Sequence, residues 1–159
     1  MTIRRLEQTD KDQLAKLLRE FYVDHKRRTF SQKLQSYEEY KDTNTVIEKT
    51  ASDYLSNPKY IIFVAQNNNE LLGYICGEIK EKPHKKLDKE GYIQDWFVSE
   101  QYRAKDIGKA LFDALVNELK NRNCTHLVLD TFTENKKAID IYHAMGFEDR
   151  LLTLIKKIQ

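Results

Sequence analysis

A strand-like segment that runs into a basic turn, Asp95–Leu111, carries the residues best suited to chemistry. Its apolar stretch ends at Val98 and helical spacing begins near Ile107, and the first turn of a helix binds phosphate through unpaired N–H groups and the positive end of its dipole. Gly108 allows a ligand to approach the backbone closely. Three basic residues lie in the same turn: Arg103, Lys105 and Lys109. These residues alone fit a phosphate site and an ordinary solvated strand-to-helix connection about equally well.

A second pattern lies downstream and favours the phosphate site. Residues Asn135–Phe147 have the form N-x-x-A-x-x-x-Y-x-x-x-G-F, and Arg103–Gly108 has the form R-x-x-x-x-G directly after a strand. As a pair, at this separation, they resemble the GNAT superfamily of acetyl-CoA-dependent N-acetyltransferases. The resemblance is strong over residues 91–147 and extends more loosely to the order of elements in the whole chain.

The resemblance implies a mixed sheet in which two neighbouring parallel strands diverge and hold the pantetheine arm of acetyl-CoA between them. The backbone of Trp96, Phe97 and Val98 would pair with that arm, and an amide near Trp96 would face the thioester oxygen. Backbone amides of the turn would hold the pyrophosphate: Arg103, Ala104, Lys105, Asp106, Ile107, Gly108 and Lys109. Asn135 would bond the arm from the opposite side, and Tyr142 would lie beside the sulfur.

One residue departs from the family pattern. The family's turn is Q/R-x-x-G-x-G/A, and Asp106 occupies the first glycine position. A carboxylate pointing toward a pyrophosphate would be unfavourable, although Asp tolerates left-handed backbone angles better than most residues. We expect the Asp106 side chain to point to solvent, with Lys105 and Lys109 offsetting its charge.

Acetyl transfer to an amine calls for a base and an acid. A lysine-like amine has a pKa near 10.4, so at pH 7 only about one molecule in 2,500 is neutral and nucleophilic. Asp95 is the candidate base because it is polar among apolar neighbours beside the expected thioester; alternatively it orients the substrate or caps a backbone bulge. Tyr142 is the candidate acid, since a departing thiolate with a pKa near 8.5 accepts a hydrogen bond from a phenol. Its alternative is a core tyrosine on an amphipathic helix.

These residues predict an enzyme that transfers an acetyl group from acetyl-CoA to a primary amine of a small molecule or peptide. We expect direct attack in a ternary complex, because no Cys or Ser nucleophile with a partnering base stands out. An acidic group, Glu38, Glu39 and Asp42, hints at a cationic acceptor. The alternative is a non-catalytic acyl-CoA-binding regulator, suggested by Asp106 and by Gln94 where an ionisable glutamate would be a better base.

The elements that must position these residues follow from hydrophobic spacing. Strands are expected at 2–6, 60–65, 71–79, 91–98, 126–132 and 151–158; helices are expected from Thr9, which we assign as an N-cap, and at 31–41, 45–55, 107–119 and 135–145. The strand–helix–strand unit at 91–132 predicts parallel pairing with a right-handed crossover. The resulting fold class is mixed α/β (α+β), GNAT-like. It has a mostly antiparallel sheet of six to seven strands, a central parallel splayed pair and about four flanking helices.

Composition sets the remaining limits. The 159 residues fit one domain, 1–159, which we assign as a single N-acetyltransferase domain. With 27 basic and 25 acidic residues the net charge is only +2, which argues against a nucleic-acid partner. The sequence shows no stretch of about 18 apolar residues and no signal peptide, so we expect a cytoplasmic protein with no membrane partner. The four histidines and two cysteines lack metal-ligand spacing, so no metal is expected. A homodimer is left open.

Overall fold

The computed structural model describes residues 1–29 and 31–158, and for residues 28 and 29 it describes the backbone. Its elements follow one another along the chain as β1 (Thr2–Arg5), α1 (Lys11–Thr29), α2 (Gln32–Glu38), α3 (Thr43–Ser56), β2 (Tyr60–Asn67), β3 (Glu70–Glu81), β4 (Lys89–Val98), α4 (Ile107–Asn121), β5 (His126–Leu129) and α5 (Lys136–Ala144). Two short 3-10 turns, η1 (Gln8–Asp10) and η2 (Glu100–Tyr102), precede α1 and follow β4. The expected strands up to β5 and the expected helices are therefore present, with ends that differ by a few residues.

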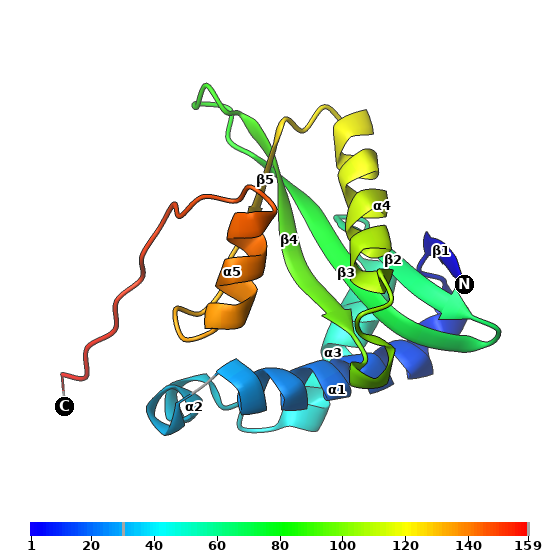
Figure 1. The fold of residues 1–159 in the computed structure, drawn as a ribbon, viewed down its shortest axis with the longest axis horizontal. Coiled ribbons are helices and arrows are strands. Elements are labelled where there is room, and N and C mark those ends of the chain that lie inside the picture. Colours follow the sequence, from blue (N-terminus) through cyan, green and yellow to red (C-terminus); the bar gives the residue numbers. More distant parts are fainter. Residues whose placement is uncertain (30, 159) are drawn as a thin grey trace.

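The five strands form one sheet in the order β1-β2-β3-β4-β5. Neighbouring strands are antiparallel as far as β4, and β4 pairs with β5 in parallel. The parallel pair is possible because α4 carries the chain back across the sheet between the two strands (Figure 1). This confirms the predicted strand–helix–strand unit.

Alternation along the strands divides the core between the two faces of the sheet. On one face, β2 contributes Ile62 and Val64, which pack with Leu14 and Leu17 of α1 and with residues of α3. On the other face, Ile61 and neighbouring strand residues pack against the apolar stripe of α4. That stripe contributes one buried side chain in each turn: Ile107, Leu111, Leu115 and Leu119. The predicted apolar face of α4 is thus the face that covers the sheet.

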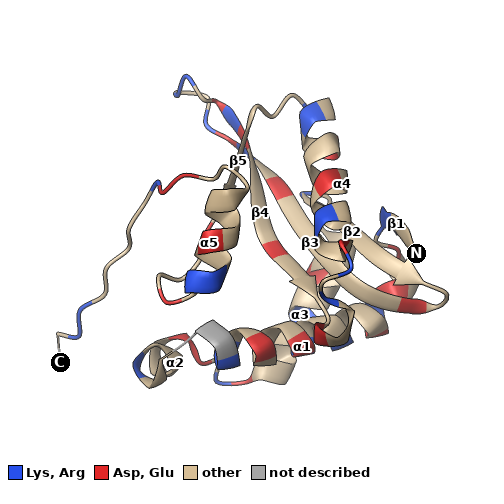
Figure 2. Ribbon diagram, in the orientation of Figure 1, with Lys and Arg blue, Asp and Glu red and all other residues tan. Residues whose placement is uncertain are grey.

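Two strand glycines let α4 lie close to the sheet. A Cβ added at Gly91 would come within 2.6 Å of a Leu119 methyl carbon, and one added at Gly77 would come within 2.8 Å of Leu115. The outer face of α4 is charged with both signs (Figure 2), and Lys109–Asp113 and Arg122–Glu118 form ion pairs one turn apart. Among the described residues, no helix is long and apolar enough to span a membrane.

Several sequence-based expectations for the fold were wrong. Residues 151–158 form no strand; they leave the body as an extended exposed segment (Figure 1), because a strand exists only where a neighbour supplies hydrogen bonds. The described part of the chain therefore has five strands instead of six to seven, and its parallel pair lies at the edge of the sheet instead of the centre. It has five α-helices instead of about four. Thr9 is not the N-cap of α1: it lies inside η1, where Asp10 accepts a hydrogen bond from the Glu7 backbone.

Candidate active site

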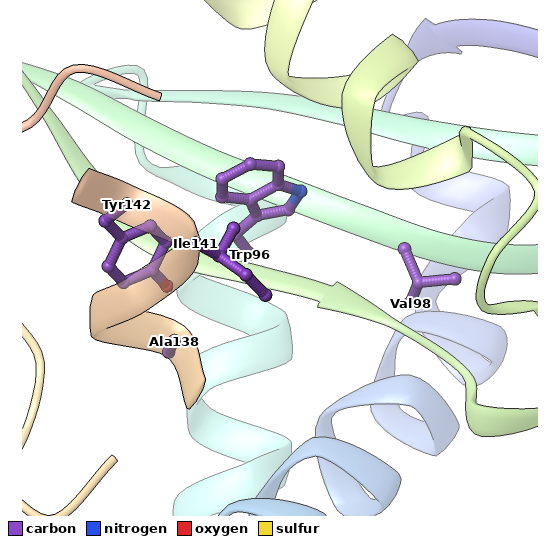
Figure 3. A pocket seen from close by; sticks show the side chains of 5 residues that line it. All are labelled: Trp96, Val98, Ala138, Ile141 and Tyr142. Carbon is purple, nitrogen blue, oxygen red and sulfur yellow. The ribbon is translucent and has the colours of Figure 1, made fainter. Parts of the chain in front are cut away.

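The parallel pairing of β4 with β5 ends halfway along β4. Their register ends at the pair Ile93–Leu129, so residues 94–98 of β4 have no neighbour on that side among the described residues. A cavity of about 180 Å³ lies beside this free stretch, between β4 and α5 (Figure 3). Its lining is mostly apolar and comes from both elements: Trp96, Val98, Ala138, Ile141 and Tyr142. β5 itself ends at Leu129, so the parallel pairing stops beside the cavity, where the family resemblance implies a space for the pantetheine arm.

A bulge in β4 decides which side chains face this cavity. Opposite the consecutive residues Cys76 and Gly77 of β3 stand Asp95 and Ile93, so Gln94 is an extra residue in β4. Bulges re-aim the side chains that follow them. After the bulge, Trp96 faces α4 and α5, whereas Asp95 and its neighbour Phe97 face α1 and α3.

Trp96 and Tyr142 form an aromatic wall of the cavity. Their rings stack at 6.3 Å with an angle of 24° between planes, and Trp96 also stacks on Phe112 of α4 at 5.1 Å. Phe147, from the G-F end of the second motif, packs edge-on against Tyr142 at 5.9 Å. Burial raises the pKa of Tyr142, so its hydroxyl stays protonated and able to donate through neutral pH. Its placement is compatible with a role as proton donor.

Asp95 is enclosed on the opposite face of the sheet. The hydroxyls of Tyr54 and Tyr74 both donate to Asp95 Oδ2, at 2.5 and 3.2 Å. Burial raises the pKa of Asp95, and the two tyrosine hydrogen bonds oppose that shift. Burial and the nearby Asp95 charge also raise the pKa of Tyr54, so this hydroxyl keeps its proton. A carboxyl group with a raised pKa is closer to the range useful for a base at neutral pH.

The turn between β4 and α4 has an unusual backbone. Ala104 and Asp106 both adopt left-handed conformations, with φ of 62° and 56°. Asp106 is the N-cap of α4, its side chain makes no capping hydrogen bond, and it is exposed, as predicted. The next residue, Ile107, is 3% exposed and anchors the helix in the core. A Cβ added at Gly108 would meet the Trp96 ring at an ordinary 3.6–3.9 Å, so the unliganded fold leaves space here that a side chain would occupy.

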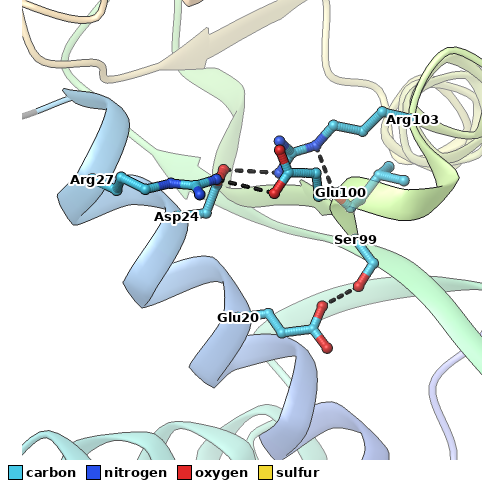
Figure 4. A network of polar contacts seen from close by, with 7 residues as sticks. Glu20, Asp24, Arg27, Ser99, Glu100 and Arg103 are labelled. Atoms are coloured by element: carbon cyan, nitrogen blue, oxygen red, sulfur yellow. Dashed lines mark hydrogen bonds and ion pairs between the residues drawn. The ribbon is translucent and has the colours of Figure 1, made fainter.

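The Arg103 side chain holds this turn in place through two polar contacts. Its Nε donates to the Val98 carbonyl at 3.0 Å, and its terminal nitrogen pairs with Asp24 of α1 at 2.8 Å (Figure 4). Beside it, Arg27 bridges Asp24 and Glu100. The Arg103 side chain therefore links α1 to the end of β4. The backbone N–H of Arg103, which was expected to hold the pyrophosphate, donates to the Glu100 carbonyl at 3.3 Å.

The other predicted site residues are placed as follows. Lys105 lies over the Tyr102 ring at 5.7 Å, and Lys109 pairs with Asp113 at 2.6 Å. Asn135 precedes α5, and its Nδ2 lies 3.5 Å from Thr131 Oγ1. Lys105 lies in the turn before α4, Lys109 lies on α4, and Asn135 lies just before α5.

Sequence reasoning missed several residues that shape the site. Ser99 at the end of β4 donates a hydrogen bond to Glu20 of α1 (Figure 4), and Asp24 and Tyr54 lie 79 and 41 residues from their partners Arg103 and Asp95. No local pattern signals contacts at such separations. The acidic group that hinted at a cationic acceptor is partly engaged elsewhere: Glu39 pairs with Lys26 at 2.6 Å, and Asp42 caps α3.

Comparison with known proteins agrees with this geometry. Residues 12–147 match the model of the Acetyltransferase (GNAT) family, and the chain belongs to that family. N-alpha-acetyltransferase 30 of Schizosaccharomyces pombe is 30% identical over 122 residues, which cover 70% of this chain and 79% of that protein. Its namesake from Saccharomyces cerevisiae is 32% identical over 72 residues, 45% of this chain, and the match spans only 41% of that relative. We therefore place the chain among the acyltransferase enzymes.

Solved structures show the same fold. A mutant protein from Bacillus halodurans superposes with a TM-score of 0.83 at 20% identity, covering 100% of both chains. The aminoglycoside acetyltransferase AAC(6')-Iy, solved with a bisubstrate analogue that contains CoA, superposes with a TM-score of 0.70 at 18% identity, covering 98% of this chain and 97% of that one. GNAT enzymes use acetyl-CoA, so the diverging strands and the turn of this chain can be tested as an acetyl-CoA site.

Proposed function

We propose that this protein transfers the acetyl group of acetyl-CoA to a primary amine by direct attack in a ternary complex. The observation that carries the proposal is the cavity of about 180 Å³ where β4 leaves β5, with Trp96 and Tyr142 on its walls and the amino terminus of α4 nearby. A pantetheine arm in that cavity pairs with the free edge of β4 at residues 96–98. The pyrophosphate then meets the backbone amides of residues 104–109, at the amino terminus of α4.

The two titratable residues take separate roles on the two faces of the sheet. Tyr142, on the cavity side, donates a hydrogen bond to the departing thiolate. Asp95, on the face of α1 and α3, accepts a proton from the amine directly or through water. A backbone N–H near Trp96, on the free edge, stabilises the oxyanion of the tetrahedral intermediate. Asn135 helps to hold the arm from the side of α5.

We propose further that the acceptor is the α-amine at the amino terminus of a peptide. The relatives named N-alpha-acetyltransferase support this choice, and so does the base. An α-amine has a pKa of about 7.8, so roughly one molecule in seven is neutral at pH 7. Restoring the neutral form of a lysine side chain costs about 4.6 kcal/mol at pH 7, against about 1 kcal/mol for an α-amine. A carboxylate bonded to two tyrosine hydroxyls suits the easier task.

Thiol release with a panel of amines tests the function. We expect CoA release with peptides that have a free amino terminus, little with the same peptides acetylated at that end, and a rate that saturates near pH 8. A rate that keeps rising toward pH 10, or that requires a lysine side chain, would contradict the α-amine acceptor. Tight acetyl-CoA binding without turnover on any amine would favour the non-catalytic regulator.

A pair of substitutions at Gly108 tests the location of acetyl-CoA. Gly108→Ala is the matched control: the family pattern allows Ala at this position and the added Cβ meets Trp96 at an ordinary 3.6–3.9 Å, so stability and acetyl-CoA affinity should both stay close to those of the unmodified protein. Gly108→Glu adds bulk and a negative charge, and should abolish binding. If acetyl-CoA raises the melting temperature of the Glu variant as it does that of the unmodified protein, the pyrophosphate binds elsewhere.

A further inference from the structure

Four aromatic side chains beside the cavity form a closed set of contacts. Trp96 stacks on Phe112 of α4 at 5.1 Å and on Tyr142 of α5 at 6.3 Å. Phe147 closes the set, because it packs edge-on against Phe112 at 6.4 Å and against Tyr142 at 5.9 Å. Each ring touches two others, so moving any one of them breaks two contacts. The indole of Trp96, which stands out from β4 between α4 and α5 (Figure 3), is therefore a fixed part of the cavity wall.

The direction of acetyl-CoA in the proposed site places its acyl group at this wall. With the pyrophosphate at residues 104–109, next to the end of β4, the pantetheine arm runs back along the strand from Val98 to Trp96. The acyl group is the leading end of the arm, and it points to the place where β4 and β5 begin to pair, at Ile93 and Leu129. Ile93, Leu129 and Trp96 belong to one packed cluster, so the acyl group faces the closed end of the cavity.

Trp96 is the side chain that determines how far this closed end extends. One edge of its indole, Nε1–Cε2–Cζ2, lies 3.6–3.9 Å from the position of a Cβ on Gly108, and the ring system stacks on Tyr142 on the other side. The indole thus spans the distance from the start of α4 to α5. A shorter aliphatic side chain at this position would leave that space open, because a packed core collapses only partly around a deletion. The opened space would be continuous with the cavity.

We propose that Trp96 limits the acyl donor to acetyl-CoA by closing the inner end of the cavity to longer acyl chains. This inference rests on the proposed function, from which it takes the position of the thioester. An acyl chain that is longer by one methylene meets the indole and the paired strands, and neither moves without breaking the contacts described above. In a hydrophobic pocket a single methylene changes kcat/KM by about 10- to 200-fold, which is enough to select one donor.

A series of donors with increasing chain length tests the limit in the full chain: acetyl-, propionyl-, butyryl- and hexanoyl-CoA. Thiol release with one peptide that has a free amino terminus gives kcat/KM for each donor. Calorimetric titration without any peptide gives the Kd of each donor. For the unmodified protein we expect kcat/KM to fall, and Kd to rise, at least about ten-fold from acetyl-CoA to propionyl-CoA.

Three variants separate the length limit from a general effect on the cavity. Trp96→Leu should remove the penalty, and each methylene that fills the opened space should then lower Kd by up to about four-fold. Trp96→Phe keeps an aromatic ring and should accept propionyl-CoA but still reject hexanoyl-CoA. Val98→Ala is the matched control: it also shortens a side chain that lines the cavity, but nearer the pyrophosphate, so it should change the Kd of every donor by the same factor.

Two results would overturn the proposal. An unmodified protein that binds and uses butyryl-CoA as well as acetyl-CoA has no length limit. A folded Trp96→Leu variant that weakens every donor by the same factor shows that the indole only supports the wall. Melting temperatures establish folding, and Trp96→Phe carries the test if Trp96→Leu does not fold. Because the titrations need no acceptor, a length limit in Kd without thiol release on any amine supports the role of Trp96 while refuting acetyl transfer.

Discussion

Replacing Asp106 by Gly offers a sharp test of how the turn before α4 binds acetyl-CoA. Asp106 has φ 56° and ψ 10°, a left-handed conformation that costs an ordinary residue about 1–2 kcal/mol and costs Gly nothing. Part of this gain is lost, because Gly makes the unfolded chain more flexible and so lowers the free energy of unfolding by roughly 0.4–1 kcal/mol. Loss of a negative charge at a helix amino terminus costs about 0.3–1 kcal/mol more. We therefore expect stability to change by less than about 1 kcal/mol.

The expected effect of this substitution on the affinity for acetyl-CoA is larger than its effect on stability, because it removes the charge repulsion between Asp106 and the pyrophosphate. If the pyrophosphate binds the amides of residues 104–109 so that two of its negative charges lie about 7 Å from the exposed Asp106 carboxylate, each would be repelled by about 0.6 kcal/mol in water. Removing the carboxylate should tighten binding about eight-fold at low salt. Screening with a Debye length of about 10 Å roughly halves the energy at 0.1 M salt, leaving about three-fold.

Calorimetric titration of acetyl-CoA at two salt concentrations measures this gain. Asp106→Asn is the matched variant, because Asn also tolerates the left-handed conformation but carries no charge; it should reproduce most of the gain. Acetyl-pantetheine, which lacks the pyrophosphate, is the matched ligand and should bind all three proteins equally. If both variants bind acetyl-CoA no more tightly than the unmodified protein at low salt, the pyrophosphate does not lie at this turn.

The other predictions concern the residues around the cavity. Tyr142→Phe should lower kcat about 10- to 100-fold while the acetyl-CoA Kd stays unchanged; an unaltered kcat measured by thiol release removes it as the acid. Asp24→Asn removes the charged partner of Arg103 and should raise KM for acetyl-CoA about three- to ten-fold with a smaller effect on kcat. If kcat falls by the same factor as KM rises, the variant is misfolded instead. Tyr54→Phe removes a hydrogen bond that lowers the Asp95 pKa, so the acid limb of the kcat/KM profile should move to higher pH; an unmoved limb argues that Asp95 only positions groups. Because the folded pKa of Asp95 is raised, the stability linked to its protonation is present below about pH 3.8 and is lost as pH rises through the folded pKa. Asp95→Asn should therefore gain Tm relative to the unmodified protein as pH rises above about 3.8, and a difference in Tm that is the same at every pH would contradict the shift.

Much of the fold was predictable because it depends on local spacing. The apolar stripe from Ile107 to Leu119 predicted α4 and the face that it buries. The family resemblance implied that the backbone at Trp96 and the Tyr142 side chain both lie at the acetyl-CoA site; the stacking of the two rings at 6.3 Å was not predicted. Both inferences needed only the periodicity of a helix or a strand, or a pattern shared by a family.

The environment of Asp95 could not be predicted in the same way. Its side chain faces α1 and α3 because Gln94 is inserted as a bulge. No residue type in this stretch of the sequence signals a bulge. Tyr54 reaches Asp95 only because α3 packs on that face of the sheet. Residues 151–158 failed as a predicted strand for a related reason: they favour a strand, but pairing depends on a neighbour that local sequence cannot specify.

The two faces of β4 explain how one short strand can serve both substrates. Because side chains alternate after the bulge, Trp96 and Val98 line the cavity proposed for the pantetheine arm, while Asp95 lies on the opposite face, toward α1 and α3. In the proposed mechanism the amine approaches from the side of α1, with Asp95 on its own side of β4 and Tyr142 on the other. The amine would lose its proton to Asp95 before or during attack, and Tyr142 would donate to the thiolate, so neither residue would have to perform both steps. That separation would need no covalent intermediate, and it would tie the proposed direct attack to the bulge at Gln94.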